Sequence, residues 1–131
     1  MKDENNAQRR DIRERAEEYA LRAVNPYRHV YRRGDGVGTL LGRQYLRSAT
    51  AIGANLVEAL SGETKRDFIH KCGIALKEAR ESKYWLALLS KAQIVKPNRL
   101  DGLLDETNQL VAIITRIILN AKKGVPKKVD L

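Results

Sequence analysis

Five basic side chains between residues 65 and 92 fall on one side of a predicted helix. Successive residues of an α-helix advance by about 100°, so residues three, four and seven positions apart share a face. The five positions span an arc of about 80°, and they are Arg66, His70, Lys77, Arg80 and Lys91. The acids Asp67, Glu78 and Glu81 fall to one side of that arc. A row of cations attracts the phosphates of a nucleic-acid backbone, so the spacing indicates a polyanion-binding surface.

A second interpretation of the same residues is a solvated helix face. Basic and acidic residues four positions apart, such as Lys77 and Glu81, often pair within one helix and have no ligand. Two features favour binding. The segment 63–96 contains eight lysines and arginines against four acids, and an oligomer would repeat the surface several times.

Composition and spacing do not indicate catalytic chemistry. The chain has 131 residues and a formal net charge of +9, which fits one soluble domain with one core. His29 and His70 lie on different predicted helices, without the spacing of a metal site or of a nucleophile and its base. The only cysteine, Cys72, lies on an apolar seam and is expected to be a buried small side chain. We therefore expect no enzymatic activity, no cofactor and no metal.

Hydropathy gives no sign of a membrane protein. The longest apolar run, Leu110 to Ile114, is far shorter than the roughly 20 residues that span a bilayer. The N-terminus also has no apolar core of a signal peptide. We expect a cytoplasmic location and no membrane partner.

The periodicity predicts four helices and no strand. Their expected bounds are 9–32, 39–60, 65–92 and 98–122, with a disordered N-terminus at 1–8 and a basic flexible tail at 123–131. Thr64, followed by Asp67, predicts a capped start for the third helix, and Asn98 is the expected cap of the fourth. Gly62 is expected to end the second helix in a left-handed conformation. Short connections then predict an all-α, antiparallel up-down-up-down four-helix bundle.

The third helix has a seam of small residues between larger ends, which would let a neighbouring helix approach closely. The seam comprises Phe68, Cys72, Ala75, Ala79, Ser82, Leu86 and Leu89. On the fourth helix, Ile113 and Leu119 lie outside the main apolar stripe, so they are expected to touch a second subunit.

Two pairs of residues have a structural and a functional interpretation. Asn55 and Glu58 are expected to satisfy each other or a neighbouring backbone group rather than to catalyse a reaction. Tyr84 and Trp85 are expected to pack, with base stacking as the alternative.

Residues 40–90 resemble the family of 23S rRNA intervening-sequence proteins. The resemblance is carried by Gln44, Arg47, Ala49, Ile52, Ala54, Asn55 and Glu58, then Phe68, Ile74-Ala75-Leu76, Lys77-Glu78-Ala79-Arg80-Glu81 and Tyr84-Trp85-Leu86. It implies a four-helix bundle that assembles as a ring-like homo-oligomer, a pentamer, without an established enzyme activity. It also implies a relation to the accessory protein of diversity-generating retroelements, which is a basic barrel that binds nucleic acid and a reverse transcriptase. Gly53 and Ala59 depart from the family pattern, which has proline and glycine at these positions.

Two functions follow as hypotheses. In the first, the chain is a non-enzymatic oligomeric bundle that binds RNA or DNA through the basic surface with little sequence specificity. In the second, it is a protein-interaction scaffold that docks an RNA-processing or reverse-transcriptase partner and binds no nucleic acid itself.

Overall fold

The protein is an all-α four-helix bundle. The computed structural model describes the backbone of residues 2–124 and the side chains of residues 12–124. It contains helices α1 (Lys2–Arg32), α2 (Gly36–Leu60), α3 (Lys65–Lys91) and α4 (Pro97–Lys122), and no strand occurs among these described residues.

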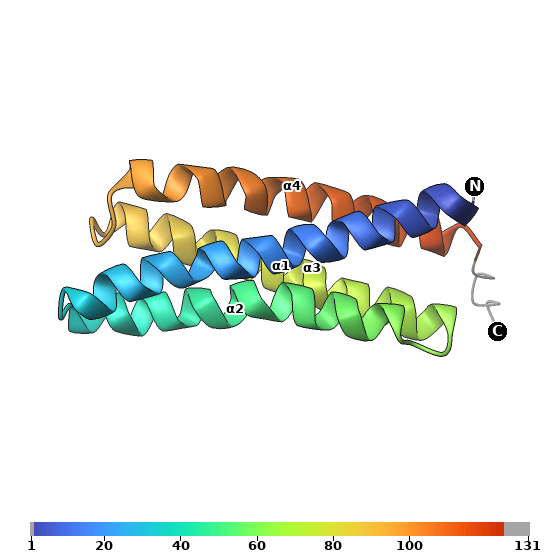
Figure 1. Cartoon of the computed structure of the whole chain (residues 1–131), viewed down its shortest axis with the longest axis horizontal. Coiled ribbons are helices and arrows are strands. Elements are labelled where there is room, and N and C mark those ends of the chain that lie inside the picture. Colours follow the sequence, from blue (N-terminus) through green and yellow to red (C-terminus); the bar gives the residue numbers. More distant parts are fainter. Residues whose placement is uncertain (1, 125–131) are drawn as a thin grey trace, which may run out of the picture.

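The four helices lie alongside one another (Figure 1). The α1–α2 and α3–α4 connections lie at one end of the bundle, and the α2–α3 connection lies at the other end with the start of α1. The packed pairs are α1 with α2, α2 with α3, α3 with α4, and α1 with α4. Each helix therefore has two neighbours, and a broad face of each is left toward solvent.

The predicted seam of α3 is confirmed, since all seven of its residues are buried. Its small side chains contact α2 closely, and the hydroxyls of Ser48 and Ser82 lie 2.8 Å apart across the two helices. Each buried hydroxyl therefore has a partner where a larger side chain would separate the helices.

A chain of hydrogen bonds crosses the middle of the core. The Tyr45 hydroxyl donates to the Tyr19 hydroxyl at 3.0 Å, the Tyr19 and Thr107 hydroxyls lie 2.6 Å apart, and Thr107 donates to the Leu103 carbonyl at 2.6 Å. Burial is the main reason that the pKa of both tyrosines is raised, so both phenols stay protonated. This chain links α1, α2 and α4. Because Thr107 donates to the Leu103 carbonyl, we assign Tyr19 as the donor to Thr107.

The helix starts were only partly predicted. Thr64 caps α3 as expected, with its side chain accepting from the Asp67 N–H at 3.1 Å. The prediction for α4 was wrong, because Lys96 occupies the cap position without a side-chain cap bond and Pro97 begins the helix, placing Asn98 inside it. Pro97 fits the first turn since its missing N–H has no partner to lose there.

The ends of α2 also differ from expectation. Its first turn begins at Gly36 because the Asp35 side chain accepts from the Gly38 N–H at 2.8 Å. Gly62 does not adopt a left-handed conformation, and Gly34 is the glycine of the described chain that does, at φ 72°. Gly62 is instead needed for space, since a Cβ there would lie 3.1 Å from the Ala59 carbonyl.

The N-terminus is a further correction. We expected disorder over 1–8, but α1 begins at Lys2. Residues 2–11 are almost entirely polar, so they show no apolar periodicity, yet an established helix extends at one backbone hydrogen bond per residue. Pro26 lies inside α1 without ending it. Of the tail expected at 123–131, residues 125–131 lie outside the described residues.

Candidate nucleic-acid interface

The five predicted basic residues lie on one uninterrupted helix, α3, and all five side chains are exposed. We call this set, Arg66, His70, Lys77, Arg80 and Lys91, the α3 basic stripe. Among the described residues, none of the five makes a side-chain hydrogen bond or an ion pair. The stripe lies opposite the buried seam, so the α3 side chains turned to the core do not restrict access to it.

The acids of α3 pair with α2 rather than with the stripe. Arg47 of α2 lies 3.5 Å from the Glu78 carboxylate and also donates to the Glu81 carboxylate. The expected alternative, a Lys77–Glu81 pair within α3, is not formed. Because one arginine holds both acids at the α2–α3 contact, the positive charge of the stripe is left without these acids as partners.

Nearer the start of α3, a second ion pair between α2 and α3 also engages an acid with a residue outside the stripe. Lys71, which is not in the stripe, pairs with Glu58 of α2 at 2.7 Å. Asn55 and Glu58 therefore do not meet each other, and Asn55 donates to the Ala51 carbonyl of its own helix at 2.8 Å. The structural interpretation of Asn55, a bond to neighbouring backbone, is confirmed.

Tyr84 belongs to the same face as the stripe, a placement that we did not predict. It follows Lys77 by seven residues and precedes Lys91 by seven, so the three residues share one side of the helix. Its side chain is 60% exposed and its ring meets the edge of Trp85 at 5.1 Å between centroids. Trp85 packs against the core as expected, but Tyr84 is available to stack on an unpaired base. The seven-residue spacing of Tyr84 from Lys77 and from Lys91 could have predicted this placement from the sequence.

The two apolar residues of α4 outside its main stripe, Ile113 and Leu119, also differ from each other in burial. Ile113 packs against the core and is half-buried, and its contact with a second subunit stays a prediction. Leu119 is 56% exposed and stays outside the core of this chain.

The part of the chain that the structure describes contains no group of three or more metal-ligating side chains. Cys72 is buried in the core, as expected. Over the same residues, no helix is long and apolar enough to cross a membrane.

These features define a basic four-helix-bundle protein with an exposed row of cations on one helix. Residues 10–116 match the model of the 23S rRNA-intervening sequence protein family. The chain therefore belongs to that family, which confirms the resemblance seen in residues 40–90.

A solved structure supports the same assignment. The chain is similar to a protein with unknown function from the S23 ribosomal protein family of Bacteroides thetaiotaomicron. The two are 33% identical with a TM-score of 0.79, and the match covers 86% of this chain and 98% of the other. No curated protein matches the chain.

Proposed function

We propose that this protein binds nucleic acid, RNA or DNA, through the α3 basic stripe, with little sequence specificity and without catalysing a reaction. The observation that carries the proposal is the exposure of five basic side chains, together with the pairing of two neighbouring acids, Glu78 and Glu81, with Arg47 rather than with the stripe. A cation without an ion pair can neutralise a phosphate without first breaking a contact in the protein.

The proposal includes the assembly. We propose an antiparallel up-down-up-down bundle that forms a ring-like homo-oligomer, a pentamer as in the resemblance, and acts in the cytoplasm. A single stripe makes few phosphate contacts, but repetition around a ring converts weak contacts into avidity. The cationic excess of the whole chain, +9, would add to the attraction at long range.

The test is the salt dependence of binding. Lys77→Glu with Arg80→Glu should weaken retention of structured RNA and of duplex DNA in a filter-binding assay. Because each lost phosphate contact lowers the slope of log affinity against log salt by about 1, the double variant should lose about 2 per subunit engaged. Circular dichroism should show unchanged helicity, since both side chains are exposed.

The matched control is Lys83→Glu. Lys83 is exposed on the same helix but lies outside the stripe, so its charge reversal should change affinity much less. If the wild-type protein retains neither RNA nor DNA at low salt, or if Lys83→Glu weakens binding as much per charge as the double variant, the proposed surface is wrong.

A second candidate function is a protein-interaction scaffold for an RNA-processing or reverse-transcriptase partner, as the relation to diversity-generating retroelements would imply. The exposed Leu119 favours it, since a large apolar side chain left outside the core suits a protein contact. A stoichiometric protein partner that stays bound after nuclease treatment, and is lost with Leu119→Lys, would support this function instead of the first.

A further inference from the structure

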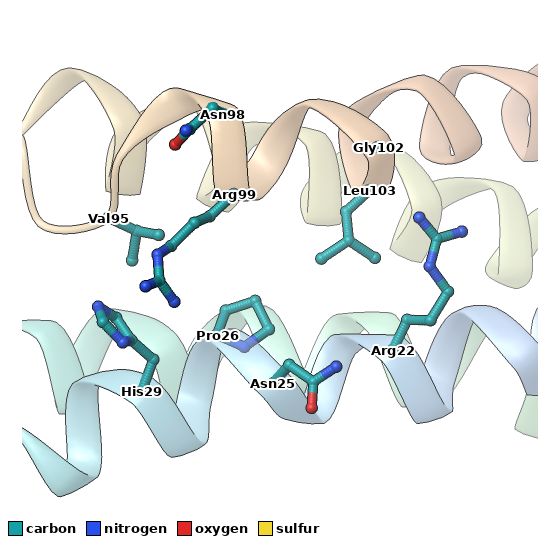
Figure 2. A pocket seen from close by; sticks show the side chains of 9 residues that line it. All are labelled: Arg22, Asn25, Pro26, His29, Val95, Asn98, Arg99, Gly102 and Leu103. Carbon is teal, nitrogen blue, oxygen red and sulfur yellow. The ribbon is translucent and has the colours of Figure 1, made fainter.

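A cleft of about 340 Å³ lies between α1 and α4, on a different side of the bundle from the α3 basic stripe. Figure 2 shows Arg22 and His29 extending from α1, and Arg99 extending from α4 toward α1. Pro26 and Leu103 lie between the two arginines and give the cleft an apolar part. Nothing in α3 contributes to its lining, so this cleft is independent of the proposed nucleic-acid surface.

The two arginines occupy positions where an ion pair would be expected. Arg15 of α1 binds Glu106 of α4 with its guanidinium 2.6 Å from the carboxylate. Seven residues further along α1 is Arg22, and seven residues earlier along α4 is Arg99. Seven residues are about two helical turns, so the same helix pair that joins opposite charges at one level brings two like charges to the cleft at the next.

Neither guanidinium has a partner within the described chain. Arg22 and Arg99 make no ion pair or side-chain hydrogen bond with residues 12–124, and no acidic side chain lines the cleft. Like charges at a shared cleft repel each other. The two guanidiniums lie at opposite ends of the cleft, Arg99 toward His29 and Arg22 toward Gly102. An anion at the first end would accept from the planar guanidinium of Arg99 and from the His29 imidazole.

His29 adds a third group to the same cleft. Burial is the first reason that the pKa of this half-buried imidazole is lowered, and the positive charges of Arg99 and Arg33 lower it further. Arg33 is itself occupied by Asp35 at 3.0 Å and by the Ile94 carbonyl at 2.7 Å. The charge that faces His29 from α4 is therefore Arg99, whose effect an anion would cancel.

We propose that this cleft binds a phosphate monoester, with the phosphate held by Arg99 and His29 at one end and Arg22 lining the other end. Phosphate suits the site because its oxygens can accept from the Arg99 guanidinium and the His29 imidazolium at once, and the volume admits the phosphate with an attached small group. Pro26 and Leu103 supply an apolar surface for that group. A phosphate monoester is either a free small molecule or the terminal phosphate of a nucleic-acid strand, and both present the same chemistry to the cleft.

The experiment follows the His29 imidazole by NMR in buffer without phosphate. The chain has two histidines, so the His70→Gln background leaves one imidazole signal. The probes are adenosine monophosphate and a short single strand with either a 5′-phosphate or a 5′-hydroxyl. A phosphorylated probe should shift the signal with saturation and raise the pKa of His29, because the bound anion stabilises the imidazolium.

Two sets of variants test the assignment to the cleft. Arg22→Gln with Arg99→Gln should weaken binding of the phosphorylated probe at least about tenfold, the loss of about 1.4 kcal/mol expected when charged hydrogen bonds are removed. Arg28→Gln with Arg116→Gln, exposed arginines of α1 and α4 outside the cleft, is the matched control.

The outcomes separate the two sources of the phosphate. Binding of adenosine monophosphate supports a free small molecule as ligand, and response to the 5′-phosphorylated strand alone supports a strand terminus. If neither phosphorylated probe shifts the His29 signal, if the 5′-hydroxyl strand shifts it equally, or if the control variant loses as much affinity, the proposal is wrong. Lys77→Glu with Arg80→Glu leaves the cleft unaltered, so these results do not depend on the α3 basic stripe.

Discussion

The hydroxyl groups of Tyr45, Tyr19 and Thr107 are ordered by a single direction of donation. Thr107 donates to the Leu103 carbonyl, which leaves its oxygen to accept from Tyr19, and Tyr19 in turn accepts from Tyr45. Tyr45 is thus the first donor and accepts from none of these groups. Tyr19 lies between the other two residues, accepting from Tyr45 and donating to Thr107.

This order predicts unequal costs for removing the two hydroxyls. Tyr45→Phe removes one bond and leaves only an acceptor with spare capacity, which should lower the free energy of unfolding by about 1 kcal/mol. Tyr19→Phe removes the bonds to Tyr45 and Thr107 and the contact with the Ser82 hydroxyl. It also leaves the buried Tyr45 O–H without an acceptor, so it should cost more, about 2–3 kcal/mol. Urea unfolding at neutral pH measures both values.

Tyr84→Phe is the control for these two variants because it removes a hydroxyl from an exposed ring, and it should change stability little. Equal costs for Tyr45→Phe and Tyr19→Phe would contradict the direction of the hydrogen-bond chain.

At the residue scale, the sequence predicted which α3 side chains are buried but not which side chains form ion pairs. The three- and four-residue spacing of the α3 seam contains the information that these side chains share a face, and all seven are buried. The pairing of Arg47 with Glu78 and Glu81 depends on how α2 and α3 meet. Spacing along one helix cannot supply that, so the sequence suggested pairing within α3 instead.

The starts of α3 and α4 form a natural comparison at the scale of elements. Thr64 supplies a side-chain acceptor to α3, while Lys96 occupies the same position of α4 with an extended backbone, φ −61° and ψ 137°, and no acceptor. The first N–H groups of a helix have no partner within it, so a cap stabilises the element it precedes.

Opposite changes at these two positions should therefore have opposite effects. Thr64→Ala should lower the free energy of unfolding by about 1 kcal/mol, and Lys96→Ser should raise it by up to about 1 kcal/mol by accepting from an N–H of the first turn. Thermal and urea unfolding measure both. Thr64→Ser and Lys96→Ala are the controls, since the first keeps an acceptor and the second adds none. Stabilisation by Lys96→Ala equal to that by Lys96→Ser would show that lost charge, not the cap, is responsible.

The elements themselves were predictable because each has an apolar stripe over most of its length, and because Gly34, Gly62 and Pro97 mark the places where one helix gives way to the next. The errors in the predicted helix bounds fall where the sequence has no apolar stripe. The polar stretch 2–8 offers no periodicity, and at 96–98 the proline and asparagine compete for one boundary. Proline took the first helical position because it needs no hydrogen-bond partner there, and the asparagine side chain was left inside the helix.

The whole molecule leaves several large apolar side chains in solvent, among them Leu21, Val37, Leu40 and Leu119. We predict that the protein is a homo-oligomer in solution, with five times the chain mass of 14.8 kDa. Light scattering coupled to size exclusion measures this mass directly. A monomer across the micromolar range would remove the ring and the avidity it provides, while leaving the binding by a single stripe to be tested.

The two candidate sites differ in how far the sequence alone could reach them. The α3 basic stripe lies on one helix, so the helical repeat is sufficient to place its five residues together. The cleft requires the register of α1 against α4, which Arg15 and Glu106 reveal only once both helices are placed. Arg22 and Arg99 are 77 positions apart in the sequence, and no periodicity within either helix connects them.

The buried thiol of Cys72 can be used to measure how often the bundle opens. The chain has one thiol, and that thiol is 1% exposed in the core. An alkylating reagent can reach this thiol only when the helices separate. The rate of labelling under native conditions therefore reports the frequency of local opening in the core. Comparing that rate with and without a bound polyanion would show whether binding tightens the core or leaves its fluctuations unchanged.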